Sequence, residues 1–395
     1  MVVLSLIIPT YNERKNITPL IARATFVLKK FTDSFEIIVV DDDSPDGTWR
    51  VAQDLTKENH HLRVIRRIDE KGLATAVMSG WREAKGEILG VMDGDLQHPP
   101  ENLLDLVNLI IHTDADVVVA SRHVGKGGVS DWSLIRRFLS WTGALLATLM
   151  LPGILRTVRD PMSGYFLIRR AVIDSVNLKP KGYKILLEVL ARGKYKTVVE
   201  VPYIFEERKE GGSKLGSRQY LEFLIHLSKL GKETGQIGRF LRFCTVGFSG
   251  VFVNEGTLKF FTEVIGLYYI YSSVLAVEIA IVSNFIFNEF WTFRDRSSLQ
   301  SAMVDRLIRL FKFNIICAIG GVLNVAILWG LTDLAGFYYL ISNLVGIGVS
   351  TLWNYGINSN ITWEVPVKHI EHELGKAEIK EELDIRDRLS AEHKK

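Results

Sequence analysis

The second half of the chain contains four apolar segments, each close in length to the thickness of a lipid bilayer. They cover roughly residues 242–262, 270–293, 311–332 and 338–361. A helix needs about 20 mainly apolar residues to cross the hydrocarbon core. Because a segment inside the bilayer must satisfy its own backbone N–H and C=O groups, it has to be helical. The sequence therefore predicts an all-α membrane domain of four transmembrane helices at residues 239–363.

The positions of the basic residues predict how these helices are oriented. No Lys or Arg occurs within 261–292 or within 314–362. The basic residues lie before the first segment, between the second and third, and after the fourth, for example at Arg239, Arg242 and Arg306. Lys and Arg favour the cytoplasmic side of a membrane. We therefore expect a multi-pass membrane protein whose N-terminal half and both termini are cytoplasmic.

An internal repeat divides the membrane domain into two parts. Residues 239–293 match residues 309–363 without a gap, and Asn284, for example, recurs as Asn354. Each part contains two segments, so both enter the membrane from the same side, which predicts two parallel hairpin repeats. The polar residues inside the segments either pair helices with one another or line a path for lipid headgroups. Glu255 and Glu278 have no counterpart in the second part and are the better candidates for the latter role.

Residues 1 to about 215 have a different pattern, typical of a soluble α/β domain. Apolar runs predict strands at 3–8, 36–40, 62–65, 88–92 and 117–120. Apolar residues recur at helical spacing over 17–31. Near-continuous apolar strands with helices between them predict a buried, mostly parallel, Rossmann-like sheet. Ligands of such sheets bind beyond the carboxyl ends of the strands.

Three further segments complete the expected organisation. Residues at about 134–152 and 216–238 combine apolar and basic positions, which predicts amphipathic helices in the membrane interface. A core helix is the alternative for the first of them. The tail at 364–395 alternates charges at helical spacing and predicts a solvated cytoplasmic helix.

The overall composition narrows the function classes. A mean hydropathy of +0.14 is high for a soluble protein and agrees with a membrane domain. A net charge of +3 is too small to indicate a nucleic-acid partner, and no feature indicates an obligate protein partner. The two cysteines, Cys244 and Cys317, lie in apolar runs, so neither a disulfide framework nor a zinc site is expected.

Three oxygen-bearing side chains follow the strand expected at 88–92. Asp93, Asp95 and Gln97 occupy alternate positions, so on an extended backbone they share one face. Hard oxygen ligands suit Mg²⁺ or Mn²⁺, which proteins commonly share with the phosphates of a substrate. Aspartates are also common in turns, so this motif alone leaves both readings open. Acidic residues after the first two strands favour the metal site, and His98 is expected to orient a ligand rather than to be one.

Basic residues supply candidate phosphate ligands. Arg122, Arg136 and Arg137 lie close before or within the first interfacial segment, and guanidinium groups bind phosphate with two parallel hydrogen bonds. Ordinary charge at a helix end is the alternative. Arg208 and Lys214 belong to a Gly-rich basic loop that either closes over a diphosphate or is simply a solvated loop. Lys184 is a weaker candidate for binding phosphate.

Four motifs together resemble glycosyltransferase family 2, whose members have the GT-A fold. They are "IIPTYNE" at 7–13, "VVDDDSPDGT" at 39–48, "EKGLATAV" at 70–77 and "MDGDLQHPP" at 92–100. More narrowly, the soluble half resembles the polyprenyl-phosphate sugar synthases, above all the dolichol-phosphate mannose synthases. The repeat at 239–363 resembles the GtrA-type membrane domain that is fused to some of these enzymes. The motifs are specific in combination but not singly.

The resemblance implies roles for individual residues. The nucleotide-binding residues would be Pro9, Tyr11, Glu13, Val40, Asp42, Asp93, Gly94, Asp95, Arg208 and Lys214. The metal ligands would be Asp93, Asp95 and Gln97. The groups that stabilise the leaving group would be Asp95, Arg208 and Lys214, and the ligands of the acceptor phosphate would be Arg122, Arg136, Ser140 and Lys184. The family usually has Ala where this chain has Gly94, a small departure.

The implied reaction transfers mannose from GDP-mannose to dolichyl phosphate and gives dolichyl β-D-mannosyl phosphate. A lipid phosphate, with a second pKa of about 6, is already largely dianionic and needs no general base. A single inverting displacement is therefore expected. The same reaction with UDP-glucose, and a flippase or carrier for lipid-linked sugars, stay open as alternatives. A processive polysaccharide synthase is disfavoured because no Gln-x-x-Arg-Trp motif occurs.

Overall fold

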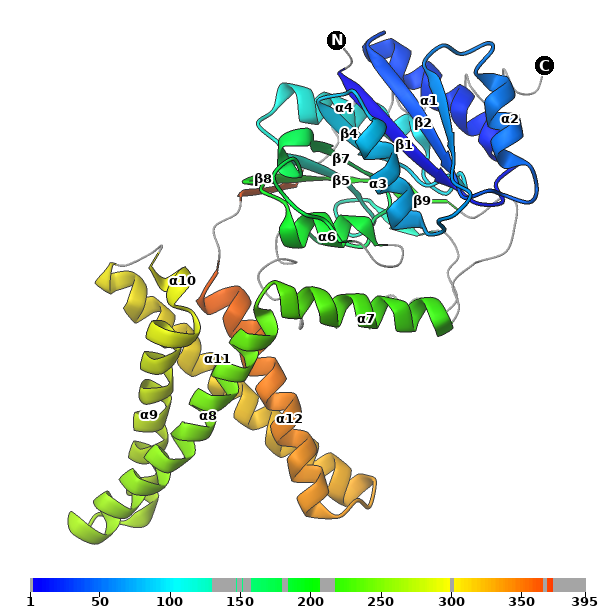
Figure 1. Cartoon of the computed structure of the whole chain (residues 1–395). Helices are drawn as coiled ribbons and strands as arrows, with labels where there is room; N and C mark the ends of the chain where they lie inside the picture. Colours follow the sequence, from blue (N-terminus) through cyan, green and yellow to red (C-terminus); the bar gives the residue numbers. More distant parts are fainter. Residues whose placement is uncertain are drawn as a thin grey trace. The chain divides into compact units, whose positions relative to one another are not determined.

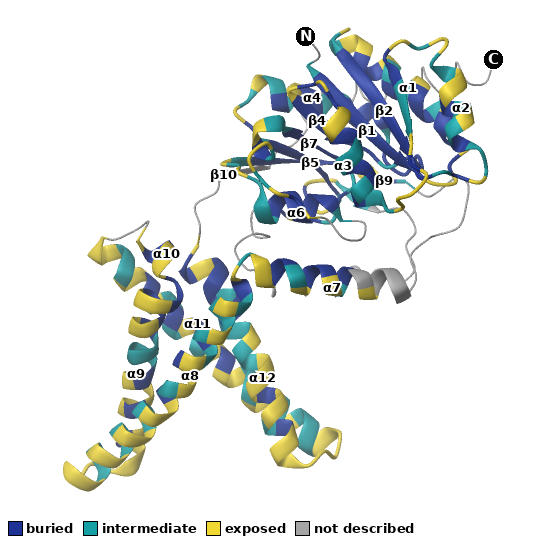
Figure 2. Ribbon diagram, in the orientation of Figure 1, coloured by how far each residue is buried: buried dark blue, intermediate teal, exposed yellow. Residues whose placement is uncertain are grey.

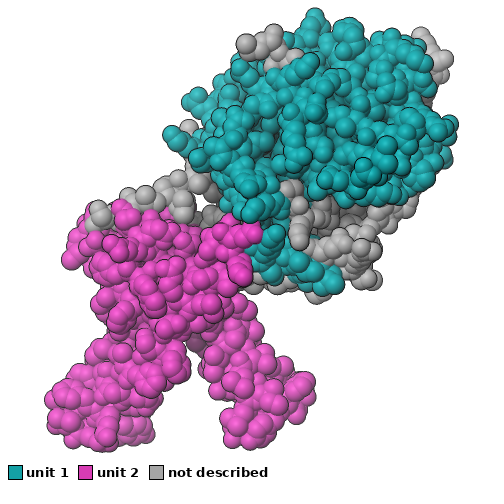
Figure 3. All heavy atoms as spheres, in the orientation of Figure 1, with its two compact units in different colours: residues 1–144, 157–230, 367–395 teal, residues 145–156, 231–366 magenta. Residues whose placement is uncertain are grey.

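The computed structural model describes residues 3–129, 147, 151, 158–179, 184–206, 217–298, 302–364 and 368–371. The chain forms two compact units (Figure 3). Unit 1 contains Met1–Ala144, Thr157–Leu230 and Val367–Lys395, and unit 2 contains Leu145–Arg156 and Gly231–Pro366. The chain therefore leaves unit 1 twice, at 145–156 and at 231–366, and returns to it each time.

Unit 1 is built on an eight-stranded mixed sheet with the order β10-β8-β5-β7-β4-β1-β2-β3 (Figure 1). Its strands are β1 Leu4–Thr10, β2 Phe35–Asp41, β3 Leu62–Arg66, β4 Ile88–Val91, β5 Val117–Ser121, β7 Phe166–Arg169, β8 Thr197–Pro202 and β10 Lys368–Glu371. Only β7 runs antiparallel to its neighbours, β4 and β5; the other pairs are parallel. The five strands expected from the sequence are confirmed to within two residues, and so is the mostly parallel sheet.

Helices lie between most of these strands, and the helix expected at 17–31 is confirmed. They are α1 Ile17–Phe31, α2 Thr48–Leu55, α3 Leu73–Glu83, α4 Leu103–His112, α6 Ile185–Arg192 and α7 Ser217–Glu233, with short 3-10 turns η1 Pro100–Asn102 and η3 Arg170–Val172. A small second sheet pairs β6 Gly128–Val129 with β9 Ile204–Phe205. Every residue of β1 and β2 is buried, and Figure 2 shows the central strands in dark blue. Burial on both faces explains why these strands are apolar throughout rather than alternating.

Among the described residues of unit 2, all secondary-structure elements are helical. They are α8 Gln236–Lys259, α9 Tyr269–Phe287, α10 Arg294–Ser297, α11 Met303–Trp329 and α12 Tyr339–Ile357, with π-helical turns η4 Phe260–Val264, η5 Asn288–Thr292, η6 Gly330–Leu334 and η7 Asn358–Thr362. The limits of α9 and α12, of η4 and η6, and of η5 and η7 each differ by 70 residues (339 − 269, 330 − 260 and 358 − 288). In both helix pairs a glycine faces an asparagine of the next helix, Gly250 with Asn284 and Gly320 with Asn354.

By length and composition, two of the described helical segments could cross a membrane. They are Tyr269–Thr292 and Met303–Leu334. Helix α8 is also long, but it contains charged residues such as Arg242 and Glu255, and α12 contains Asn343 and Asn354. Membrane crossing by α8 and α12 stays a prediction.

Three boundaries differ from expectation or lie outside the described residues. The tail was expected to be a helix, and this is wrong at Lys368–Glu371, which form β10 beside β8; the rest of the tail is not described. The helix expected at 216–238 ends at Glu233, and Gly235, with a φ of 74°, separates it from α8. Of the interfacial segment at 134–152, only Ala147 and Leu151 are described.

Candidate active site

The carboxyl ends of β1, β2 and β4 meet at one edge of the sheet. The register pairs Thr10 with Asp41 and Ile7 with Val91, so the residues that follow these strands are brought together. Asp41 itself is structural. Its carboxylate accepts hydrogen bonds from the hydroxyls of Thr10 and Ser44, both at 2.7 Å, and from the Ser44 N–H at 2.8 Å.

Asp42, the next residue, is held from two sides. Its Oδ1 accepts a hydrogen bond from Arg67 Nε at 2.7 Å, and its Oδ2 accepts one from the Gly72 N–H at 2.6 Å. These partners fix the orientation of a carboxylate that the family resemblance assigns to the nucleoside. The sequence analysis missed Arg67 and Gly72, although Gly72 belongs to the quoted motif at 70–77. Its φ of 137° strongly favours glycine there.

Those of the other predicted nucleotide-binding residues that the structure describes lie around the same edge. Pro9 and Val40 are partners in the β1–β2 register. Tyr11 is 37% exposed, and Lys71 Nζ lies 5.4 Å from the centre of its ring. Glu13 accepts a hydrogen bond from Asn16 Nδ2 at 2.7 Å. A cavity of about 710 Å³ opens beside Tyr11, and the residues that line it include Arg14, Ser44, Trp49, Arg66 and Lys71. Asp93, Asp95 and Gln97 are not among its lining residues.

The extended backbone expected for Asp93, Asp95 and Gln97 is wrong, because these residues follow β4 on a tightly turned backbone. Leu96 has a φ of 61°, and the carboxylate of Asp95 accepts the Gln97 N–H at 3.1 Å. Gln97 is clamped to Glu206: its Nε2 donates to the Glu206 carbonyl, and its own carbonyl accepts the Glu206 N–H, both at 3.0 Å. Because the amide nitrogen of Gln97 is used as a donor, the amide oxygen is the atom available as a metal ligand.

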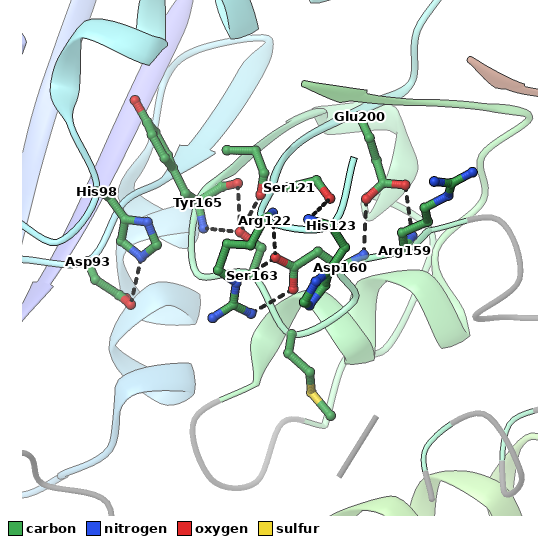
Figure 4. Close-up of polar contacts among 12 residues, drawn as sticks. Asp93, His98, Ser121, Arg122, His123, Arg159, Asp160, Ser163, Tyr165 and Glu200 are labelled. Atoms are coloured by element: carbon green, nitrogen blue, oxygen red, sulfur yellow. Dashed lines mark hydrogen bonds and ion pairs between the residues drawn. The ribbon is translucent and has the colours of Figure 1, made fainter. Parts of the chain in front are cut away.

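Asp93 lies between a histidine and a glycine. His98 Nε2 is 3.3 Å from its Oδ2 (Figure 4), so His98 contacts a candidate ligand as expected. A Cβ on Gly164 would lie only 2.5 Å from the same oxygen, so the absence of a side chain there leaves room for the carboxylate. Among the described residues no three His, Cys, Asp or Glu side chains form a metal-binding group. Two carboxylates and one amide nevertheless fit Mg²⁺ or Mn²⁺ when phosphate oxygens complete the shell.

Arg122, which directly follows β5, forms a buried ion pair with Asp160 (Figure 4). Arg122 Nε and Nη2 each donate to one oxygen of Asp160 at 2.7 Å, and the Arg122 N–H donates at 3.0 Å. Asp160 is 1% exposed. Glu200, in β8, accepts the backbone N–H of Arg159 at 2.8 Å and that of Asp160 at 3.0 Å. Glu200 therefore fixes the loop that contains Arg159 and Asp160, and Asp160 in turn fixes the side chain of Arg122.

The electrostatics keep this pair charged. Burial alone would raise the pKa of Asp160, but the hydrogen bonds and the charge of Arg122 outweigh it and lower that pKa below 3.8. The same contacts raise the pKa of Arg122 despite its own burial. Burial raises the pKa of the neighbouring Tyr203 hydroxyl well above 10. The sequence assigned Arg122 to the acceptor phosphate but missed its partner Asp160. A single glutamate inside the apolar strand "VVEVP" was the available signal for Glu200, since buried carboxylates need partners.

The remaining predicted residues are divided between described and undescribed parts of the chain. Lys184 Nζ donates to the carbonyl of Met162 at 2.7 Å, which attaches Lys184 to the loop that contains Asp160. The other predicted ligands lie outside the described residues, namely Arg136, Ser140, Arg208 and Lys214.

Comparisons with known proteins agree with these observations. The model of "Glycosyl transferase family 2" matches residues 5–176, and that of "GtrA/DPMS, transmembrane domain" matches residues 242–363. The chain is 44% identical over 361 residues to the dolichol-phosphate mannosyltransferase of Pyrococcus furiosus, which covers 91% of this chain and 99% of that protein. It is 36% identical over 235 residues to the enzyme of the same name from Saccharomyces cerevisiae, covering 57% of this chain and 86% of the relative.

The chain belongs to glycosyltransferase family 2, in the group of dolichol-phosphate mannosyltransferases with a GtrA-type membrane domain. The resemblance drawn from the four motifs is thus confirmed. Among solved structures, glucosyl-3-phosphoglycerate synthase from Mycobacterium tuberculosis with Mn²⁺, UDP-glucose and phosphoglyceric acid matches with a TM-score of 0.44 and 18% identity, over 58% of this chain and 80% of that one.

Proposed function

We propose that this glycosyltransferase transfers mannose from GDP-mannose to dolichyl phosphate with inversion, giving dolichyl β-D-mannosyl phosphate. The observation that supports it most is the 44% identity with the Pyrococcus furiosus enzyme over 99% of that protein. The names of the relatives specify mannose and dolichol phosphate. GDP as the donor nucleotide rests on the resemblance of the four motifs.

On the donor side, Asp93, Asp95 and Gln97 would hold Mg²⁺ or Mn²⁺. Bound there, the metal supplies positive charge that stabilises the departing diphosphate. The chain fixes these ligands itself, because His98 contacts Asp93 and Glu206 clamps Gln97. Arg208 and Lys214 are proposed to neutralise the same leaving group from the Gly-rich loop. Asp42, fixed by Arg67 and Gly72, is proposed to orient the nucleoside.

On the acceptor side, the task is to position a nucleophile that is already ionised. The lipid phosphate must approach the anomeric carbon in line with the leaving group, and holding it there is the main contribution that the protein can make. Asp160 fixes the guanidinium of Arg122, and a fixed planar guanidinium binds phosphate in one orientation. Arg136, Ser140 and Lys184 are proposed to complete the phosphate site.

The membrane region is proposed to be two parallel hairpin repeats, α8–α9 and α11–α12, that cross the bilayer four times. The support is the 70-residue offset between the limits of their elements. Unit 1 and both termini would be cytoplasmic. Helix α7 and the segment at 134–152 would lie in the interface, where α7 presents Leu221 and Ile225, 58% and 53% exposed.

The test uses the purified full chain with dolichyl phosphate and Mn²⁺, comparing GDP-mannose with UDP-glucose. We expect a mannosyl lipid from GDP-mannose, with a β-anomeric linkage by NMR and no product after chelation of the metal. Preference for UDP-glucose would contradict the donor. An α-linked product would contradict the single displacement, and lipid translocation without any sugar transfer would support a carrier instead.

A further inference from the structure

A buried carboxylate joins helix α7 to helix α6. Glu188, fully buried in α6, has its Oε2 3.0 Å from Nε2 of His226 in α7. His226 is only 2% exposed. The other oxygen of Glu188 accepts the backbone N–H of Lys179 at 2.7 Å and lies 2.6 Å from Arg192 Nε. Burial alone would raise the pKa of Glu188, but these hydrogen bonds, that from His226 foremost, lower it below 4.5. The carboxylate is thus ionised and contacts Lys179, Arg192 of its own helix and His226 of α7.

His226 lies on the inner face of a two-sided helix. Phe223, Leu227 and Leu230 of α7 are buried, as His226 is, whereas Leu221 and Ile225 are exposed. The inner face is therefore covered by other parts of the chain, Glu188 of α6 among them, and the outer face is the one proposed to meet the membrane interface. On the inner face, the hydrogen bond to Glu188 is a directional contact, whereas the packing of apolar side chains tolerates sliding.

The N-terminal end of α6 contacts the loop that contains Asp160 and Gly164. Lys184 immediately precedes α6 and is four residues from Glu188 in the sequence. Lys184 Nζ holds the Met162 carbonyl at 2.7 Å. Met162 lies two residues from Asp160, which holds Arg122, and two residues from Gly164, whose backbone borders the Asp93 carboxylate.

We propose that Glu188 and His226 are positioning residues that fix α6, and through Lys184 the loop at 159–165, so that Arg122 is oriented for the acceptor phosphate. The docking of the membrane-facing helix α7 is thereby linked to the acceptor side of the active site. This inference rests on the proposed function, because that function assigns Arg122 to the lipid phosphate.

The first test compares His226→Phe, which keeps the ring volume but loses the hydrogen bond, with His226→Gln, which keeps an N–H donor. Both are measured as full-length protein in bilayers of one neutral lipid, with dolichyl phosphate and GDP-mannose varied separately. We expect His226→Phe to raise the KM for dolichyl phosphate by up to about tenfold, because Arg122 would be less well oriented, with the KM for GDP-mannose unchanged. The KM of His226→Gln for dolichyl phosphate should be close to that of wild type. Ser228→Ala, on the exposed side of α7, is the matched control and should behave as wild type.

The second test does not depend on activity. Hydrogen–deuterium exchange of the loop at 159–165 is compared in wild type, His226→Phe and Glu188→Gln. Faster exchange of this loop in both variants, but not in Ser228→Ala, is expected. Unchanged exchange, or a lower active fraction with both KM values unchanged, would overturn the inference and leave a purely structural role. Failure of wild type to use GDP-mannose would instead contradict the proposed function. The exchange result would still show whether the contact between Glu188 and His226 fixes the loop at 159–165.

Discussion

The two sides of the candidate active site are built in different ways. The donor side is made of residues that directly follow β1, β2 and β4, and Asp93, Asp95 and Gln97 are near neighbours in sequence. The acceptor side depends on Arg122 and Asp160, 38 residues apart, and on Glu200, 40 residues beyond Asp160. On the donor side, the proposed metal ligands need phosphate oxygens of a substrate to complete the coordination shell. On the acceptor side, the charge of Arg122 is already paired with that of Asp160 inside the protein.

The largest expected effect is the loss of a donor-side carboxylate. Asp95→Ala should lower kcat by about a hundredfold to a thousandfold or more, because the diphosphate would leave with less charge stabilisation. Transfer from GDP-mannose measures it, and circular dichroism should show a folded protein. Asp33→Ala, which removes an exposed aspartate at the opposite end of β2 from the site, is the control. Unchanged transfer by Asp95→Ala would refute the metal assignment.

Loss of the acceptor-side carboxylate should affect stability as well as binding. Asp160→Asn leaves Arg122 buried with no opposing charge from Asp160, which should cost about 3–5 kcal/mol of unfolding free energy. Denaturant unfolding measures this loss, and the KM for dolichyl phosphate should rise while that for GDP-mannose stays close to wild type. An equal rise of both KM values would show that the two sides are not separate.

Two glycines beside Asp93 give a matched pair of variants. A Cβ on Gly164 would lie 2.5 Å from the Asp93 carboxylate, whereas a Cβ on Gly94 would lie 3.0 Å from the methyl group of Thr10. Gly164→Ala should therefore displace Asp93 and lower kcat about tenfold or more, since small displacements of reacting groups are costly. Gly94→Ala should stay within about threefold, because a small shift of Thr10 accommodates the methyl group. If Gly94→Ala is the more damaging variant, the geometry around Asp93 is wrong.

The smallest effect concerns the dependence of stability on pH. The pKa of Asp160 is lowered in the folded protein, so its ion pair stabilises the fold above the ordinary value of 3.8, and this contribution is lost as the pH falls through the folded pKa. Unfolding free energy measured between about pH 3 and pH 7 should therefore fall on acidification, and the fall should be shallower in Asp160→Asn. The same slope in both proteins would mean that another group determines it.

The sequence predicted where the donor-side residues lie, but not the conformation of the segment that contains them. Parallel strands end at one edge of the sheet, which places Asp93, Asp95 and Gln97 beside the residues that follow β1 and β2. The backbone expected to be extended at 93–97 is instead a turn, in which Leu96 has a φ of 61°, and the metal-binding role of these residues stays a prediction. Local patterns of apolar residues gave the first five strands and the helix at 17–31.

The acceptor side could not be predicted in the same way. Asp160 and Glu200 become partners of Arg122 and of the loop only when β5, β8 and residues 159–165 come together in the fold. The spacing of apolar residues along the sequence does not indicate such long-range contacts. The tail is a second example of this kind. Its alternating charges predicted a helix, whereas pairing with β8 makes Lys368–Glu371 a strand. Strand formation depends more on the neighbouring strand than on intrinsic preference.

Strand β10 also has a consequence for how the protein is made. The ribosome synthesises β8 before the helices of unit 2 and β10 after them. Until β10 emerges, β8 has an open edge with unpaired backbone groups, the kind of edge that pairs with other chains. The sheet that holds Glu200 is thus completed only after the helices of unit 2 have been translated, so the catalytic unit cannot finish folding while those helices are still being synthesised.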